Sequence, residues 1–211
     1  RDRSVVGPGL REPAALAAGE PLSLTILHTN DFHAHVDEWV TGGVTIGGSA
    51  RLATEIARVR AADPNVLLVD AGDQFQGTLF FNVFRADVVT ATMNMLDYDA
   101  MAVGNHEFDH GPAELARFID GANFPVIGTN ISVSPSNPLS GTLRHSAAIN
   151  VGGQPIGLIG LTTPSAASGS SPGPDVTFAD PQVSARAAVE DLTRRGIDKV
   201  VALTHLGYAA D

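Results

Sequence analysis

The chain contains no cysteine among its 211 residues, so it forms neither disulfide bonds nor thiolate metal sites. This absence leaves the cellular compartment open, because oxidising and reducing surroundings both tolerate a cysteine-free chain. Lysine is also scarce, since Lys199 is the one lysine among 13 basic residues. We interpret that scarcity as a genomic bias without functional content.

Long hydrophobic runs are missing as well. No apolar stretch reaches the roughly 18 to 20 residues needed to cross a bilayer, so no membrane span is expected in this chain. A start methionine and a signal-peptide hydrophobic region are also absent, which is typical of a processed product. Residues 1–20 are rich in Arg, Pro, Ala and Gly without periodicity, and we expect them to form a leader or linker.

Positively charged residues are outnumbered by negatively charged ones, which gives a formal net charge of −10. Nucleic-acid polymers are bound through basic patches that release counterions, so this charge argues against such partners. An acidic protein that handles a small anion needs local positive charge, and two divalent cations would provide it. Acidity also serves solubility in many proteins, so the charge alone decides little.

Short apolar runs alternate along the chain with segments of helical periodicity, and 211 residues suffice for one domain with a proper core. This alternation indicates an α/β architecture, and Gly152-Gly153 between two apolar segments predicts a hairpin. The expected strands are 22–28, 66–70, 100–103, 125–129, 143–151, 154–161 and 198–204, and the expected helices are 49–62, 86–96, 112–120 and 181–195. We interpret Gly42–Gly48 as a flexible connection, residues 132–142 and 164–175 as surface loops, and Phe75, Phe80, Phe81 and Phe84 as core and wall residues.

Four of the apolar runs stop at polar residues that bind metals well. The runs are LSLTILH, VLLVD, DAMAV and VVALT, and they precede Asp31, Asp73, Asn105 and His205 respectively. Open α/β sheets place ligand-binding groups just beyond the carboxyl ends of their strands. Four strands that end in such groups therefore aim them at one region, and this pattern predicts a hydrolytic metalloenzyme.

Each cluster also has an ordinary structural interpretation. Asp31 and His33 share one face if the backbone is extended, and a carboxylate with an imidazole suits Zn²⁺ or Mn²⁺; the alternative is a turn beside a surface histidine. Asp73 could bridge two metals with one oxygen each, but an isolated Gly-Asp is more often a turn or a helix cap. His205 could equally be a histidine satisfied by hydrogen bonds at a strand end.

The densest cluster is GNHEFDHG. An Asn105 amide oxygen can join a metal shell, while His106 points elsewhere and is free for acid or electrostatic work. Asp109 is three residues further on and could fix the tautomer of His106. A turn rich in Asn and Asp would explain Asn105 and Asp109, but it leaves the adjacent His106 and Glu107 unexplained, so here we favour the functional interpretation.

Taken together, these motifs resemble the calcineurin-like metallophosphoesterase domain of the 5′-nucleotidase family. The motifs are TNDFHAH, DAGDQFQGTLFF, DAMAVGNHEFDHG, FPVIGTNI and VVALTHLG, and the resemblance runs from about Leu22 to Asp211. It implies a four-layer αββα sandwich over residues 21–211, with the site at the strand ends. It also implies the following roles: Asp31 and His33 bind the first metal, Asp73 bridges both, Asn105 and His205 bind the second, and His106 and Asp109 form the catalytic pair.

One feature of that family is not found here. The family pattern continues with a Gly-His-x-(His/Asn/Gln) segment that completes both metal shells, and with a C-terminal domain that grips the nucleoside. Neither follows His205, which lies six residues before the end of the sequence. The resemblance therefore predicts an incomplete metallophosphoesterase domain.

The function implied by the resemblance is hydrolysis of nucleoside 5′-monophosphates by water that two divalent cations activate. Asn105 and His106 would contact the phosphate, and the location would be extracytoplasmic. Alternatives within the superfamily are a 2′,3′-cyclic nucleotide phosphodiesterase, a nucleotide-sugar hydrolase or a sulfate thiohydrolase. A different class of function, a binding module or inactive fragment, also stays open.

Overall fold

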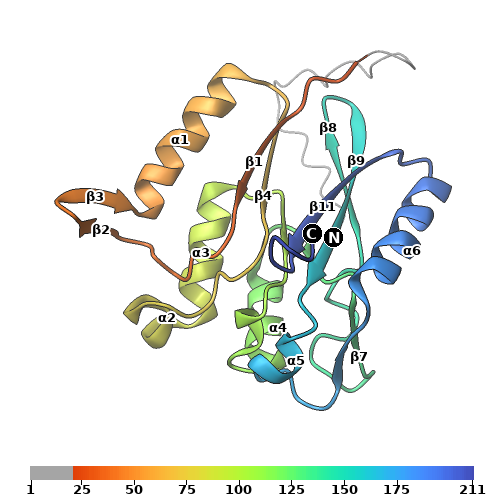
Figure 1. Ribbon diagram of the computed structural model, residues 1–211. Helices are drawn as coiled ribbons and strands as arrows, with labels where there is room; N and C mark the ends of the chain where they lie inside the picture. The colour runs from red at the N-terminus through yellow and green to blue at the C-terminus, as the bar shows by residue number, and fades with distance from the viewer. Residues whose placement is uncertain (1–20) are drawn as a thin grey trace.

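The structure is a computed structural model that describes residues 21–211; the predicted leader, residues 1–20, lies outside the described residues. The first sheet contains four parallel strands in the order β1 (Thr25–Thr29), β4 (Val66–Asp70), β5 (Ala100–Ala102) and β6 (Val126–Ile127). Figure 1 shows α1 (Ser49–Ala62), α3 (Ala86–Leu96) and α4 (Pro112–Gly121) on its outer side. The periodic apolar faces predicted for these three helices pack there against Leu68 and Met101.

A second sheet lies against the inner face of the first. Its order is β11 (Lys199–His205), β9 (Gln154–Thr162) and β8 (Ala147–Val151), with β9 and β11 parallel and β8 and β9 forming the predicted hairpin. Helix α6 (Pro181–Arg194) covers its outer face, where Leu192 packs against Ile159 of β9.

The alternation of side chains along the strands creates this layering. In β4, Leu67 and Val69 point into the space between the sheets, whereas Leu68 points to the helices. In β9, Ile156 and Leu158 face the first sheet, whereas Ile159 faces α6. Strands buried on both faces need apolar residues at successive positions, as VLLV and IGLIGL provide. The predicted four-layer αββα sandwich is confirmed.

Several short elements differ from the prediction. The supposed flexible connection contains a hairpin of β2 (Glu38–Thr41) and β3 (Val44–Gly47), which turns at Gly42 and Gly43 with φ of 56° and 78°. Helix α2 (Leu79–Phe84) was not predicted, because its apolar run has no helical period; Phe81 is buried as expected, but Phe84 is 55% exposed. The first predicted surface loop begins with β7 (Ile131–Val133), which pairs with β10 (Val176–Phe178) directly after the second loop. The second loop contains α5 (Ala166–Gly169).

No helix within residues 21–211 combines the length and the apolar character that crossing a membrane requires.

Candidate metal centre

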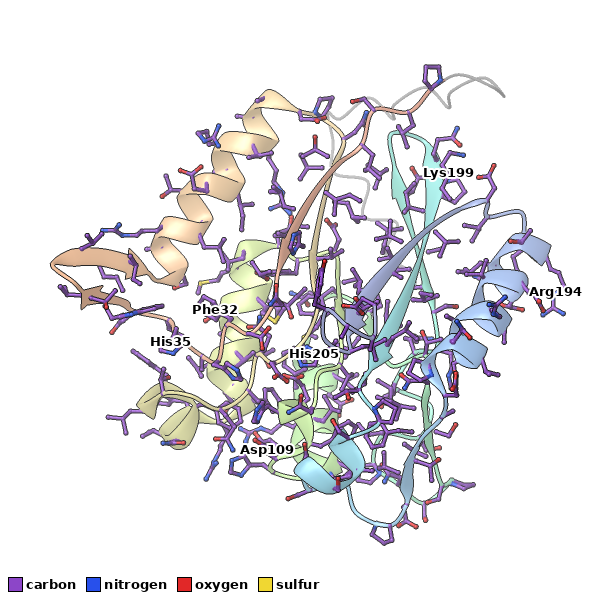
Figure 2. All side chains as sticks on the ribbon, viewed as in Figure 1. Phe32, His35, Asp109, Arg194, Lys199 and His205 are labelled. Atoms are coloured by element: carbon purple, nitrogen blue, oxygen red, sulfur yellow. The ribbon has the colours of Figure 1, made fainter. Side chains whose placement is uncertain are left out.

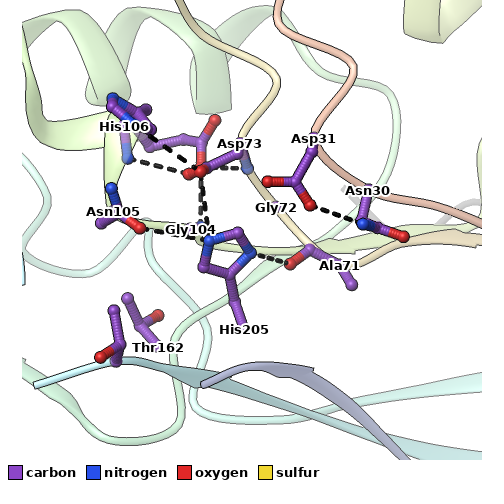
Figure 3. Close-up of polar contacts among 12 residues, drawn as sticks. Asn30, Asp31, Ala71, Gly72, Asp73, Gly104, Asn105, His106, Thr162 and His205 are labelled. Atoms are coloured by element: carbon purple, nitrogen blue, oxygen red, sulfur yellow. Dashed lines mark hydrogen bonds and ion pairs between the residues drawn. The ribbon is translucent and has the colours of Figure 1, made fainter. Parts of the chain in front are cut away.

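Loops that follow β1, β4, β5 and β11 meet at the carboxyl ends of their strands (Figure 3). Two groups of donor atoms there are compact enough to hold an ion. In each group, one ligand atom per residue lies within 4.8 Å of the others; the groups are His33, Asp73, His106 and Asp31, Asp73, His205. Asp73 belongs to both groups, so four other predicted site residues, Asp31, His33, His106 and His205, gather around one carboxylate.

Asp73 is buried and its two oxygens have different partners. Oδ1 accepts the backbone N–H of His106 at 2.9 Å. Oδ2 lies 3.2 Å from Nε2 of His205, 3.9 Å from Nε2 of His106 and 4.0 Å from Nε2 of His33. Oδ2 is thus the oxygen that faces all three imidazoles, whereas the sequence led us to expect that each oxygen serves one ion.

Two glycines bring the loops after β4 and β5 close together. A Cβ atom on Gly72 would lie 2.5 Å from the backbone nitrogen of Gly104. A Cβ atom on Gly104 would lie 2.3 Å from Oδ1 of Asp73. Both distances are too short for any side chain, so glycine is required at the point where the two backbones meet.

The loop after β1 reaches the site by a different route from the one predicted. Asp31 and His33 are not extended but have φ of 51° and 48°, and their backbone N–H groups donate to the carbonyls of Gly72 and Asp73. Asp73 itself has a φ of 61°. Residues other than glycine are strained in this region, and such strain concentrates at functional sites.

Backbone carbonyls of the Asp73 loop orient two imidazoles. Nδ1 of His33 lies 2.8 Å from the carbonyl oxygen of Phe75, and Nδ1 of His205 lies 2.9 Å from that of Ala71. A carbonyl only accepts, so each Nδ1 carries a proton, and Nε2 is the nitrogen of each ring that is left to face the site. Nε2 of His205 also lies 3.2 Å from Oδ1 of Asn105.

His106 and Asp109 form the predicted pair. The Asp109 carboxylate lies 2.6 Å from Nδ1 of His106, so Nε2 of His106 is left facing Asp73. Burial opposes protonation of His106, but the hydrogen bond with Asp109 and the negative charges of Asp73, Asp109 and Glu107 together outweigh it and raise the pKa of the imidazole. A histidine held in this way can keep a proton at Nε2 for a negatively charged group in the site.

Ionisation at the centre favours a cation. Burial disfavours the charged form of His205, but the hydrogen bond and charge of Asp73 outweigh it and raise its pKa to about 9. Burial likewise opposes ionisation of Asp73, yet His205 and the His106 backbone N–H hold its pKa below the usual range. Asp73 thus stays negative and attracts whatever positive charge is nearby, either a proton on His205 or a metal ion.

The donor set fits divalent cations. Atoms that share one ion at bond lengths of about 2.0–2.2 Å lie roughly 3–4 Å apart, which is the range found around Oδ2 of Asp73. Imidazole nitrogens with carboxylate and amide oxygens suit Zn²⁺, Mn²⁺ and similar ions. Figure 2 shows Lys199 and Arg194 well away from His205 and Asp109, so these basic side chains do not supply the local positive charge.

The sequence did not reveal the residues that hold this arrangement together. Glu107 is completely buried, and its carboxylate accepts backbone N–H groups from both the Asp73 loop and Gly104. Asn130 and Thr162 are buried between the two sheets. The one signal for Glu107 was an ionisable residue inside GNHEFDHG, and the signal for Asn130 was a polar residue within FPVIGTNI. Neither pattern indicates which way the side chain points or which groups it contacts.

Comparisons with known proteins identify the family of this chain. The calcineurin-like phosphoesterase family profile matches residues 24–209. A snake venom 5′-nucleotidase from Crotalus adamanteus is 44% identical over 206 residues, which are 93% of this chain and 35% of that protein.

Solved structures show the same likeness. A 5′-nucleotidase precursor from Thermus thermophilus superposes with a TM-score of 0.84 at 47% identity, over 88% of this chain and 38% of that one. The NAD nucleotidase of Haemophilus influenzae gives a TM-score of 0.82 at 32% identity, over 88% and 34%. The chain thus spans little more than a third of the length of these relatives.

Proposed function

The chain belongs to the calcineurin-like phosphoesterase family, and we propose that it is the metal-binding catalytic part of a 5′-nucleotidase. Its reaction would be hydrolysis of the phosphomonoester of nucleoside 5′-monophosphates. The observation that carries the proposal is the position of Oδ2 of Asp73, within 4.0 Å of three imidazole Nε2 atoms, from the segments after β1 and β5 and from the end of β11. Relatives named 5′-nucleotidase, at up to 44% identity among the curated sequences, support the substrate class.

Two divalent cations would occupy the centre. We assign Asp31, His33 and Asp73 to the first, since Nε2 of His33 also lies 3.9 Å from Oδ1 of Asp31, and Asp73, Asn105 and His205 to the second. This assignment divides the two compact donor groups differently and leaves His106 for the substrate. The cations would act as Lewis acids that activate water and neutralise phosphate charge. The protein itself fixes the donors: the carbonyls of Ala71 and Phe75 set the tautomers of His205 and His33 before any ion arrives.

His106 would act directly on the substrate. Its Nδ1 is held by Asp109, and its Nε2 faces the same space as Oδ2 of Asp73. From there its proton would stabilise charge on a phosphate oxygen or protonate the leaving ribose oxygen. The amide nitrogen of Asn105 is the second donor that we assign to phosphate, because Oδ1 of Asn105 already faces His205.

Recognition of the nucleoside and completion of the metal shells would come from segments other than residues 21–211. The relatives are nearly three times as long as the region they share with this chain, which supports this division of labour. We also propose an extracytoplasmic location, because one similar relative is a snake venom protein.

A neighbouring substrate class follows from one comparison. The NAD nucleotidase of Haemophilus influenzae, at 32% identity, makes NAD a substrate worth comparing with AMP. A panel of AMP, NAD, a 2′,3′-cyclic nucleotide and a nucleotide sugar, each with the same metal, would distinguish these activities by their kcat/KM values.

Metal content measured beside turnover tests the proposal. Asp73→Asn should lose bound Mn²⁺ or Co²⁺ and hydrolysis of AMP together, because it weakens the carboxylate that both donor groups share. His106→Ala should keep the metal but lose about 10²- to 10⁴-fold in kcat, the usual contribution of a general acid. His145→Ala, at an exposed histidine outside both donor groups, is the matched control. Full AMP hydrolysis by both site variants would overturn the assignment.

A further inference from the structure

We propose that Glu107 is a positioning residue that sets the metal centre by holding the backbone of the Asp73 loop. The proposal rests on the metal-dependent function above, and it concerns a buried side chain that belongs to neither donor group. Glu107 follows His106 directly, but its side chain is fully buried, whereas His106 reaches the site.

The Asp73 loop directs its backbone N–H groups at buried carboxylates. Gly72 donates to Asp70 at 2.8 Å. The next three residues donate to Glu107: Asp73 at 2.9 Å, Gln74 at 2.8 Å and Phe75 at 3.1 Å. Gly104, from the loop after β5, adds a fourth bond to Glu107 at 2.7 Å. One carboxylate therefore joins the loops that carry Asp73 and Asn105.

The opposite side of the same loop carries the ligands. The carbonyl of Phe75 accepts from Nδ1 of His33, and the carbonyl of Ala71 accepts from Nδ1 of His205, as Figure 3 shows for His205. The carbonyls of Gly72 and Asp73 accept from the backbone of Asp31 and His33. A shift of this loop would therefore move Asp73 and disturb the hydrogen bonds that orient both histidines.

A carboxylate is the group that suits this position. Its two oxygens accept four backbone N–H bonds, two each: Oε1 from Gln74 and Phe75, and Oε2 from Asp73 and Gly104. Glutamine has one accepting oxygen and one NH₂ group, so in either orientation two backbone N–H groups would face another donor. Removing an acceptor from buried N–H groups forces the loop to move or leaves them unpaired.

Glu107→Gln should therefore weaken metal binding while the substituted residue touches no ion. With Mn²⁺ or Co²⁺ alone as the probe, we expect the dissociation constant to rise by about 10- to 100-fold, as for other residues that orient metal ligands. The visible absorption spectrum of bound Co²⁺ should change too, because the angles among its ligands change. In AMP hydrolysis, kcat should fall more than KM rises.

Asp99→Asn is the matched control. Like Glu107, Asp99 accepts a backbone N–H, that of Leu68 at 2.8 Å, but it is only partly buried and it lies beside the middle of β4, outside the Asp73 loop. It should lower the melting temperature without altering the Co²⁺ spectrum or the metal affinity. A metal affinity and Co²⁺ spectrum unchanged in folded Glu107→Gln would overturn the proposal.

Hydrogen exchange of the wild-type protein in EDTA tests the same idea without a variant. The amides of Asp73, Gln74, Phe75 and Gly104 should exchange slowly, because Glu107 accepts all four. Exchange of these amides as fast as that of an exposed loop would overturn the proposal even if Glu107→Gln failed to fold. Wild-type protein that binds neither Mn²⁺ nor Co²⁺ would instead contradict the proposed function.

Discussion

The two sheets contribute unequally to the metal centre. The first sheet supplies five of the six residues of the centre, namely Asp31, His33, Asp73, Asn105 and His106, from three loops that are hydrogen-bonded to one another. The second sheet supplies His205 alone, at the end of β11, which within residues 21–211 pairs with a strand only on its β9 side. The first half of the site is thus fixed by its own loops, whereas the second half depends on how the sheets are held together.

A set of buried polar contacts joins the sheets near the site. The hydroxyl of Thr162, at the end of β9, donates to the carbonyl of Val103, the residue directly after β5. The Asn130 side chain accepts the N–H of Thr162 at 2.9 Å and donates to its carbonyl at 2.8 Å. The N–H of Thr163 then donates to the carbonyl of His205 at 2.9 Å. These contacts connect His205 to the loop of Asn105 by a short path.

Gly104→Ala should have the largest effect on metal binding, because it acts inside the tightly connected half. The added Cβ atom would lie 2.3 Å from Oδ1 and 2.5 Å from N of Asp73, so the two loops must separate. We expect a loss of about 1–3 kcal/mol in stability from the forced backbone shift and a drop in Mn²⁺ affinity larger than that of Glu107→Gln. Thermal unfolding and metal titration would measure both.

The control for this change is Gly169→Ala, since no heavy atom outside the neighbouring residues lies within 4 Å of the added Cβ atom. It should leave the metal affinity unaltered. Equal metal affinities for Gly104→Ala and the wild type would show that the loops after β4 and β5 need not touch.

Asn130→Ala should have an intermediate effect on metal binding, because it loosens the contact between the sheets and leaves the first-sheet loops intact. Two backbone groups of Thr162 would lose their partner in a buried place, at about 1–3 kcal/mol each. Metal binding should weaken less than in Gly104→Ala. Asn150→Ala is the control, because Asn150 is an exposed asparagine of β8, in the same sheet as Thr162. Unfolding curves and metal titrations of the two variants, measured in parallel, would compare them.

Asp70→Asn should have the smallest effect on metal binding. Its main effect should be a change in how stability depends on pH. Burial raises the pKa of Asp70 to about 7, above its ordinary value of 3.8. The folded state therefore retains a proton that the unfolded state releases, so the free energy of unfolding falls as pH rises between about 4 and 7. Asparagine has no such proton, and the melting temperature of the variant should fall less across this range.

Melting curves in EDTA at several pH values would measure this slope. Exposed Asp37→Asn should keep the wild-type slope. Equal slopes for Asp70→Asn and the wild type would mean that Asp70 is ionised in the folded protein throughout the range.

The sequence predicted the elements whose pattern is local. Helices α1, α3, α4 and α6 follow apolar residues at helical spacing, and the strands before Asp31, Asp73, Asn105 and His205 are apolar runs closed by polar residues. The convergence of these side chains was predictable from the strand ends. The β2–β3 hairpin and the β7–β10 pair were missed, because strands of three or four residues are too short to show a period.

The sequence could not predict how each residue reaches the site. Asp31 and His33 were expected to share a face of extended backbone, but tertiary hydrogen bonds hold them in a left-handed conformation instead. Glu107 and Asn130 serve residues that are 32 to 34 positions away in the chain. No spacing rule connects positions so distant, so only the folded backbone reveals them.

The left-handed backbone of Asp31, His33 and Asp73 lowers the stability of the fold in order to place the ligands of the site. Each residue occupies a conformation that glycine adopts freely and that costs other residues of the order of 1–3 kcal/mol. Selection for thermal robustness alone would favour glycine at all three places, and the ligands would vanish with each gain. The presence of Asp and His at these three positions indicates that backbone strain has been retained there because the ligands are needed for function.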